Sequence, residues 1–307
     1  MSPFKGIALK LCSVVLFVVM SSLIKAASEA VPPGQAVFFR SLFAIPVILG
    51  WLALRGDLAT GLRVNSPIGH FWRGFVGTAA MGLMFAGLGL LPLPEVTALG
   101  YTAPLLTVVF AAMFLDERVG LFRIAAVALG LVGVLIVLAP RLSTLTGENV
   151  QTTQAVGAVM VLLGATCAAL AQIYIRKLVA TEQTSAIVFY FSATSTLLSL
   201  LTLPFGWAIP GVTETIYLIL AGLLGGLAQI FLTSAYRFAD ASVVAPFDYA
   251  SMLFALIIGY VIFDEVPTGA MLLGAALVIV AGIIIILRER HLGIKRGKAR
   301  ALRTPQG

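Results

Sequence analysis

The stretch SVVAPFDYASMLFALIIGYVIFDE, residues 242–265, is apolar enough to cross a membrane, yet it carries a carboxylate at Asp248. An apolar run of roughly 20 residues rises about 30 Å as a helix, which matches the hydrocarbon core of a bilayer. An ionised side chain inside such a run costs at least a few kcal/mol and is rarely kept for stability. The stretch therefore predicts a membrane span, and Asp248 is the first candidate for a functional residue.

The whole chain shares this apolar character. Of its 307 residues, 60% are hydrophobic and 11% are charged, with a mean hydropathy of +1.06, far outside the range of soluble domains. We expect an all-α membrane protein with ten transmembrane helices, near residues 6–24, 35–54, 71–91, 95–115, 119–139, 154–175, 185–205, 213–236, 241–263 and 267–287. The longest connection, residues 140–153, is too short to fold alone, so we expect no soluble catalytic domain.

Positive charges are distributed unevenly between the two sides of these spans. Sixteen lysines and arginines, Arg73 among them, fall on one side, and only Lys25 and Arg141 fall on the other. The positive-inside rule then predicts that both termini are cytoplasmic. We interpret the basic tail, residues 289–307, as a cytoplasmic anchor that touches anionic lipid, and we expect no nucleic-acid partner.

The opening stretch has a counterpart earlier in the chain, PEVTALGYTAPLLTVVFAAMFLDE at residues 94–117. At a constant offset of 148 residues, Tyr101 aligns with Tyr249, and Asp116-Glu117 align with Asp264-Glu265. Each stretch is followed at once by one more apolar span. The spans therefore divide into two copies of five, which we place at residues 6–139 and 154–288 with a linker at 140–153.

A copy with an odd number of spans must enter the membrane upside down relative to the copy before it. We therefore expect two inverted five-helix repeats. This is the design of secondary transporters, whose substrate site lies near the midplane between the repeats and whose access alternates between the two sides.

At this point the sequence resembles a known family. Two copies of five spans, the glutamates Glu117 and Glu265 closing the fourth span of each copy, the pattern AVFFRSLFA and the run AYRFADASVVAPFDYASMLFA are similar to the EamA family of the drug/metabolite transporter superfamily. The resemblance covers residues 6–288. It implies a carrier of small metabolites in the bacterial inner membrane, and GQAVFFRSLFA with APFDYASMLFA looks closest to the branch with bacterial riboflavin importers and S-adenosylmethionine carriers.

Asp248 is the leading candidate for the substrate site. Helical spacing puts Ala245, Asp248, Tyr249 and Met252 on one face, which we interpret as a cavity wall. Asp248 would accept a hydrogen bond from the substrate or carry a proton; the alternative is a packing pair with a serine or arginine of a neighbouring span.

Tyr101 and Tyr249 are related by the repeat, so we expect them to approach each other about the pseudo-twofold axis. Their flat apolar faces and polar hydroxyls suit a planar ligand, although a purely packing role is the alternative. Arg40 either extends along the helix to the outer surface or faces inward toward the substrate or Asp248. Tyr190 holds roughly the place of Arg40 in the second copy, and Gln229 is a weaker candidate.

Other residues receive a structural interpretation. Lys10 lies near the cytoplasmic edge of its span, and we expect its ammonium to reach the surface. Glu117 and Glu265 end spans at opposite faces, where a gating or helix-end role outweighs substrate contact. We expect no catalytic residue, no metal site and no cofactor, because the sequence contains no HExxH, GxSxG or paired His/Asp set.

The sequence thus predicts a ten-helix secondary transporter of a small metabolite in the bacterial inner membrane, surrounded by lipid, as a monomer or homodimer. Riboflavin uptake is our first prediction for the cargo. An S-adenosylmethionine carrier and an amino-acid or drug exporter are the alternatives with the same fold. A membrane-embedded enzyme and a passive channel are the rivals of a different class.

Overall fold

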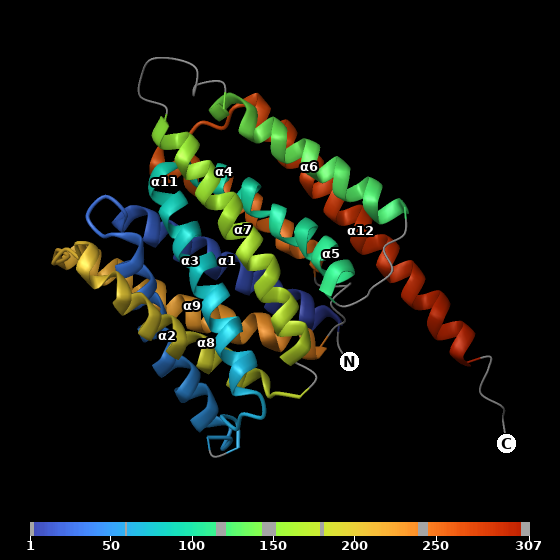
Figure 1. Cartoon of the computed structure of the whole chain (residues 1–307), viewed down its shortest axis with the longest axis horizontal. Helices are drawn as coiled ribbons and strands as arrows, with labels where there is room; N and C mark the ends of the chain where they lie inside the picture. The colour runs from blue at the N-terminus through green and yellow to red at the C-terminus, as the bar shows by residue number, and fades with distance from the viewer. Residues whose placement is uncertain are drawn as a thin grey trace.

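The computed structural model describes residues 3–58, 60–114, 121–142, 152–178, 181–238 and 245–301. Over these residues the chain forms helices packed side by side, without a strand (Figure 1). The first half contains α1 (Pro3–Ala27), α2 (Pro33–Leu54), α3 (Pro67–Leu90), α4 (Leu93–Gly100), α5 (Thr102–Phe114) and α6 (Leu121–Leu142). The second half contains α7 (Thr152–Leu178), α8 (Thr184–Ser199), the 3₁₀ helix η2 (Leu200–Phe205), α9 (Val212–Phe238), the 3₁₀ helix η3 (Ala245–Tyr249), α11 (Ala250–Phe263) and α12 (Gly269–Ala301).

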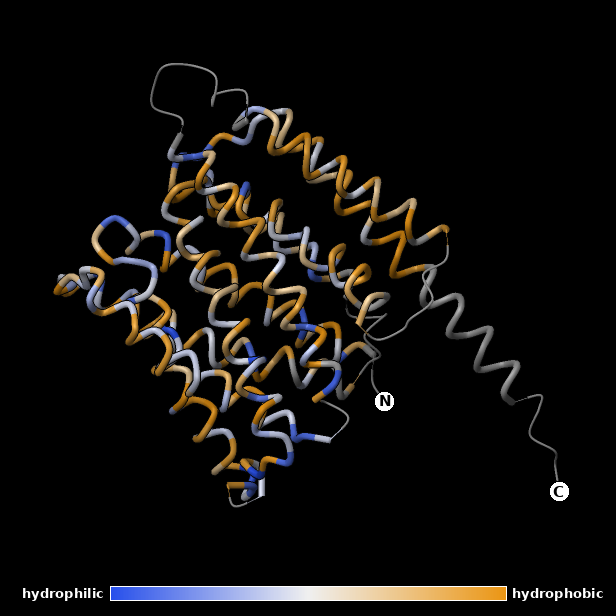
Figure 2. The backbone as a smooth tube through the Cα atoms, viewed as in Figure 1, coloured by the Kyte–Doolittle hydropathy of each residue, from blue (hydrophilic) through white to orange (hydrophobic). Residues whose placement is uncertain are grey.

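The described helices match the predicted class of all-α membrane protein. Eight stretches are long and apolar enough to cross a membrane: Phe4–Ala27, Pro33–Leu54, Pro67–Leu90, Leu93–Phe110, Thr153–Ile175, Thr184–Phe205, Val212–Leu232 and Gly269–Leu287. Two shorter apolar helices, Ile124–Pro140 and Phe247–Phe263, fall on the two remaining predicted spans. Figure 2 shows that α6 and α12 are hydrophobic along most of the length drawn in colour.

The packing of the helices is reciprocal between the two halves. The third helix of one half packs against the first helix of the other, because α1 lies along α9 and α3 lies along α7. Helices of equal rank also meet, since α2 contacts α8 and α6 runs side by side with α12 (Figure 1). Exchanging the halves leaves this set of pairs unchanged, as a pseudo-twofold axis between two repeats requires. The two-repeat fold predicted from the sequence fits this arrangement.

The fourth span of the first half is broken, which differs from the continuous helix predicted over 95–115. α4 ends at Gly100, Tyr101 caps it, and α5 begins at Thr102. Pro104 accounts for the break, because proline has no N–H to donate to the carbonyl oxygen of Gly100, four residues earlier, and its ring crowds that oxygen.

The corresponding span of the second half is also irregular, so the continuous helix predicted over 241–263 is wrong in its first part. Residues Ala245–Tyr249 form a 3₁₀ helix that contains Pro246, and α11 follows from Ala250. A 3₁₀ helix has three residues per turn instead of 3.6, so the predicted common face of Ala245, Asp248, Tyr249 and Met252 does not hold across this segment. Broken helices at membrane depth occur where protein covers the freed backbone, commonly at transporter binding sites.

Small side chains form much of the interface between the helices. Ala98, Ala158, Ala221, Ala255 and Ala281 are all completely buried. Small residues let helix backbones approach closely, which is how helices associate where lipid removes the hydrophobic driving force. Large apolar side chains such as those of Leu135, Leu163 and Ile257 are exposed instead, as expected for a surface that faces lipid.

Candidate functional site

Tyr101 and Tyr249 meet where the two broken spans come together. Their ring centroids lie 5.0 Å apart in an edge-to-face arrangement, with an interplanar angle of 70°. Tyr101 follows α4 and Tyr249 ends η3, so each ring is held at the break of its own span. The predicted approach of these two tyrosines is confirmed, and its basis is the repeat symmetry.

The Tyr101 hydroxyl is tied into the second half of the chain. It lies 2.6 Å from Oγ of Ser251, and Ser251 Oγ donates to the backbone carbonyl of Asp248 at 2.7 Å. The Tyr101 hydroxyl also donates to the backbone carbonyl of Tyr249 at 3.4 Å, so both contacts hold it against the same segment. Both tyrosine side chains are buried where the two broken spans meet.

Asp248 forms an ion pair with Lys10 of α1. The Lys10 Nζ lies 2.6 Å from Asp248 Oδ1. Only 2% of the Lys10 side chain is exposed, whereas 49% of the Asp248 side chain is exposed. The prediction that the Lys10 ammonium reaches the membrane surface is therefore wrong. The predicted packing partner of Asp248 was a serine or an arginine. The partner is instead Lys10 of the first span, because a buried ammonium is more stable beside a carboxylate than in hydrocarbon.

Arg40 and Arg73 approach a single aromatic ring from different helices. The guanidinium carbon of Arg73, on α3, lies 3.7 Å from the centroid of Phe191 of α8, and that of Arg40, on α2, lies 5.8 Å from it. Both side chains are buried, at 9% and 3% exposure. Arg40 therefore takes the inward alternative, although it does not pair with Asp248. Arg73, which the charge count assigned to the cytoplasmic side, is a buried residue.

Neither arginine has a counter-charge within the part of the chain that the structure describes. The Nε and Nη1 atoms of both Arg40 and Arg73 are buried without a hydrogen-bond partner there. A cation–π contact contributes about 2 kcal/mol when desolvated. Burying an unpaired ion costs several kcal/mol. One shared phenyl ring therefore does not compensate for two buried guanidinium groups.

Tyr190 lies apart from the tyrosine pair. Its hydroxyl donates to the carbonyl of Leu62 at 3.2 Å, and its ring lies 5.2 Å from that of His70. His70 Nε2 is 3.6 Å from Oε2 of Glu182, whose other oxygen accepts the backbone N–H groups of Asn65 and Ser66. These contacts join the α2–α3 connection to α8, and they hold the Tyr190 hydroxyl at that connection.

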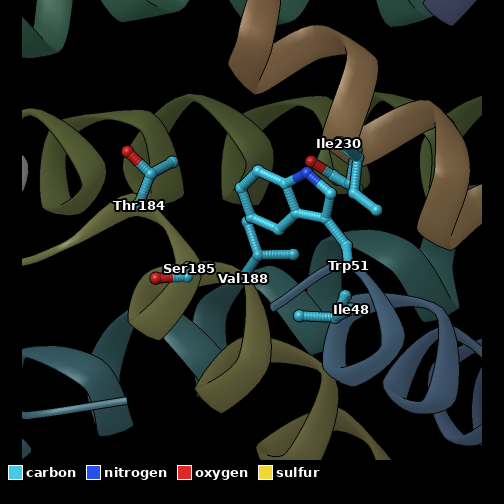
Figure 3. Close-up of a pocket in the computed structure, with 7 residues that line it drawn as sticks. Ile48, Trp51, Thr184, Ser185, Val188 and Ile230 are labelled. Carbon is cyan, nitrogen blue, oxygen red and sulfur yellow. The ribbon is translucent and has the colours of Figure 1, made fainter. Parts of the chain in front are cut away.

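Gln229 lines a small, mostly apolar pocket between α2, α8 and α9. The lining residues are Ile48, Trp51, Thr184, Ser185, Val188, Gln229 and Ile230 (Figure 3). The Ser185 hydroxyl already donates to the carbonyl of Gly61. The lining includes neither Tyr101 nor Tyr249, so the structure separates Gln229 from the residues with which it was grouped.

Glu265 lies in the connection that follows α11 and pairs with Lys25 at the end of α1. Lys25 Nζ is 2.9 Å from Glu265 Oε1 and also donates to the carbonyls of Leu88 and Leu91, at 3.2 and 2.7 Å. The other carboxylate oxygen accepts the backbone N–H of Leu93 at 2.8 Å. Glu265 thus joins both halves of the chain at one end of the bundle. Its repeat-related counterpart, Glu117, lies outside the described residues.

The sequence does indicate that Arg73 lies inside its span, but the predicted span started too late to show it. Pro67 occupies the first helical position of α3, a place that proline favours because its missing N–H is not needed there. A span counted from Pro67 puts Arg73 six residues deep, whereas the predicted boundary at residue 71 left it at the edge. No sequence signal paired Lys10 with Asp248, since 238 residues separate them.

Comparison with known proteins assigns the family. The model of the EamA-like transporter family matches residues 4–139 and again residues 155–288. The pseudopaline exporter CntI of Pseudomonas aeruginosa is 31% identical over 281 residues, which is 91% of this chain and 95% of that protein. The riboflavin transporter of Rhizobium johnstonii is 32% identical over 264 residues, covering 85% and 83% of the two chains. The S-adenosylmethionine uptake transporter of Rickettsia bellii is 27% identical over 262 residues, covering 85% and 86%.

Two features of these matches agree with the structure. The family model occurs twice, once in each half of a bundle whose helices pack reciprocally. These three bacterial relatives are an exporter and two transporters by name, and their names differ in the solute they carry. The chain therefore belongs to the EamA-like transporter family, as a multi-pass protein of the bacterial inner membrane.

Proposed function

We propose that this protein is a secondary transporter that carries a small metabolite by alternating access between two inverted repeats, residues 6–139 and 154–288. The observation that supports this most directly is the meeting of Tyr101 and Tyr249, 5.0 Å apart, at the breaks of the two fourth spans. Discontinuous helices at the interface of inverted repeats are where such carriers bind their substrates. Tyr101, Tyr249 and Asp248 are the residues we assign to this central region.

The ends of the bundle supply the gates in this proposal. With both termini in the cytoplasm, the Lys25–Glu265 pair lies on the outer side and closes it. Glu117, which the repeat relates to Glu265, has the same task on the inner side. No cofactor and no ATP hydrolysis are needed, because rocking one repeat against the other changes the side of access.

Riboflavin uptake is our first cargo assignment. It draws on the resemblance to the riboflavin branch, on the relative named as a riboflavin transporter, and on an aromatic pair suited to a planar ring. S-adenosylmethionine is the second candidate, supported by the relative named as its uptake transporter. One of the relatives is an exporter by name, so the direction of transport has to be measured.

The test is growth of a riboflavin-auxotrophic bacterium that lacks its own importer, at limiting riboflavin. We expect the wild type to restore growth and Arg55→Gln, which changes an exposed arginine paired with Asp57, to match it. Purified protein in liposomes is assayed in parallel with labelled riboflavin and labelled S-adenosylmethionine. Transport of S-adenosylmethionine alone would overturn the riboflavin assignment and keep the carrier. A well-inserted protein that moves no metabolite of a broad labelled panel would overturn the carrier itself.

A further inference from the structure

Two buried arginines, Arg40 of α2 and Arg73 of α3, approach the same aromatic ring, that of Phe191 in α8. Arg40 lies seven residues from the start of α2 and Arg73 six residues from the start of α3, so each is about 10 Å from its helix end at 1.5 Å per residue. Consecutive spans run in opposite directions, so these depths are counted from opposite faces of the membrane. Both residues therefore lie well inside the ~30 Å hydrocarbon layer, counted from opposite faces, and their guanidinium groups meet at the ring of Phe191.

The carboxylates of Asp248 and Glu182 are engaged with other residues. Asp248 is paired with Lys10, and Glu182 accepts two backbone N–H groups while facing His70. Among the described residues, no aspartate or glutamate oxygen lies within ion-pair distance of Arg40 or Arg73. The described part of the chain thus supplies two forked hydrogen-bond donors and, for their buried Nε and Nη1 atoms, no acceptor.

Glycines keep space beside both guanidinium groups. A Cβ on Gly225 of α9 would lie 3.1 Å from Nε of Arg40, and a Cβ on Gly77 of α3 would overlap both Nη1 of Arg73 and the ring of Phe191. A methyl group at either position would push against an arginine side chain, so both glycines leave room for the guanidinium groups in the interior.

We propose that Arg40 and Arg73 together bind an oxyanion of the transported metabolite, a carboxylate or a phosphate, with Phe191 packed against the adjoining part of the cargo. Guanidinium is the side chain suited to this task, because its planar fork matches two oxygens of a carboxylate or phosphate and it stays charged in an apolar environment. An anion between the two arginines also removes their mutual repulsion. This inference rests on the proposed carrier function and narrows its cargo.

The site discriminates between the candidate cargos by charge. Riboflavin has no ionised group at neutral pH, whereas S-adenosylmethionine has a carboxylate and riboflavin 5′-phosphate has a phosphate. Arg40 and Arg73 come from two different helices, α2 and α3, so an anion held between them contacts both helices at once.

The binding test uses two matched probe pairs on full-length protein in lipid nanodiscs. One pair is S-adenosylmethionine and its decarboxylated form, and the other is riboflavin 5′-phosphate and riboflavin. We expect the wild type to bind the anionic member of at least one pair more tightly, by about 10- to 100-fold, as hydrogen bonds to a charged group imply. Arg40→Gln and Arg73→Gln should each remove this preference, and the exposed control Arg55→Gln should keep it.

Three binding results would overturn the proposal: equal affinity within both pairs, a preference that survives in both arginine variants, or no binding of any probe. Transport by the same protein in liposomes separates this from the carrier function. Uptake of riboflavin without any anion preference would leave the carrier standing and remove the arginine site. Anion preference without flux of any probe would support the site and count against those probes as cargo.

A second measurement needs no ligand. An unpaired buried charge destabilises a protein, so Arg40→Gln and Arg73→Gln should melt at a higher temperature than the wild type in anion-poor buffer. Cations that serve the fold would behave in the opposite way. If both variants melt below Arg55→Gln, the arginines are structural and the proposal fails.

Discussion

The ammonium nitrogen of Lys10 on α1 lies 2.6 Å from Oδ1 of Asp248 in η3, which links the first span of one half to the broken span of the other. The lysine end of this pair is enclosed and the aspartate end is half-exposed. A proton or a cationic group that reaches Asp248 therefore competes directly with Lys10. We therefore expect that a change in charge at Asp248 alters the packing of the two halves against each other.

Breaking this pair from the aspartate side should be more harmful than removing it altogether. Asp248→Asn removes the carboxylate charge 2.6 Å from the buried Lys10 ammonium, and we expect it to lose up to about 3 kcal/mol of stability, since one partner is half-exposed. The double variant Lys10→Met/Asp248→Asn removes both charges and should recover most of that loss. Thermal unfolding of the purified variants measures both effects, and a double variant no more stable than Asp248→Asn would contradict the ion pair.

The Lys25–Glu265 pair should control opening at the end of the bundle where α1 ends. Glu265→Gln weakens the contact with Lys25, and a loss of about 1 kcal/mol raises the open fraction about fivefold. The readout is maleimide labelling of Leu99→Cys, a buried position of α4, in a background with Cys12 and Cys167 replaced by serine.

We expect faster labelling in Glu265→Gln. The matched control is Glu214→Gln, a carboxylate in the first turn of α9, which should label at the rate of the parent. Equal rates in both variants would show that the Lys25–Glu265 pair does not hold this end closed.

Gly282 should tolerate no methyl group, because it faces the hydroxyl of Tyr249. A Cβ at residue 282 would overlap the Tyr249 hydroxyl oxygen, and the expected cost of such overpacking is about 1–3 kcal/mol. Gly50→Ala is the matched control, since nothing lies within 4 Å of a Cβ at that position of α2. The melting temperature of Gly282→Ala should fall while that of Gly50→Ala stays level or rises. Equal melting temperatures would mean that Tyr249 occupies another position.

The orientation of the chain in the membrane can be checked with reporters. The uneven distribution of lysine and arginine predicts a cytoplasmic C-terminus. A fluorescent protein fused there should fluoresce, and alkaline phosphatase at the same place should be inactive. Phosphatase placed between α1 and α2 should be active, and the reverse pattern would invert the topology.

The sequence predicts contacts of the fold correctly where its internal symmetry carries the information. Tyr101 and Tyr249 were paired through an offset of 148 residues, and their rings meet because both repeats place the same position at the axis. The prediction for Lys10 is wrong, since the distance to the nearest membrane edge says nothing about which neighbour lies beside the side chain. The sequence leaves the direction of the Arg40 side chain undecided for the same reason, because a long side chain at one depth has both an outward and an inward position available.

The sequence also predicts wrongly that spans containing proline are continuous helices. Hydropathy treats residues 95–115 as one helix, whereas Pro104 cannot complete the hydrogen bond to Gly100, and the helix breaks at Tyr101. The break was readable from the sequence in principle. Its consequence, an irregular turn that places Tyr101 against a partner from the other half, was not.

The sequence by itself determined that this chain is a helical membrane protein of two related halves and that it belongs among transporters, because apolar length and internal repetition are written along the chain. Only the tertiary structure decided which charges meet. It paired Asp248 with Lys10 and left Arg40 and Arg73 facing Phe191 without an acidic partner among the described residues. The reason is physical: hydropathy reports transfer of each residue into lipid, one at a time, whereas the energy of a buried charge depends on what the fold brings within a few ångströms of it.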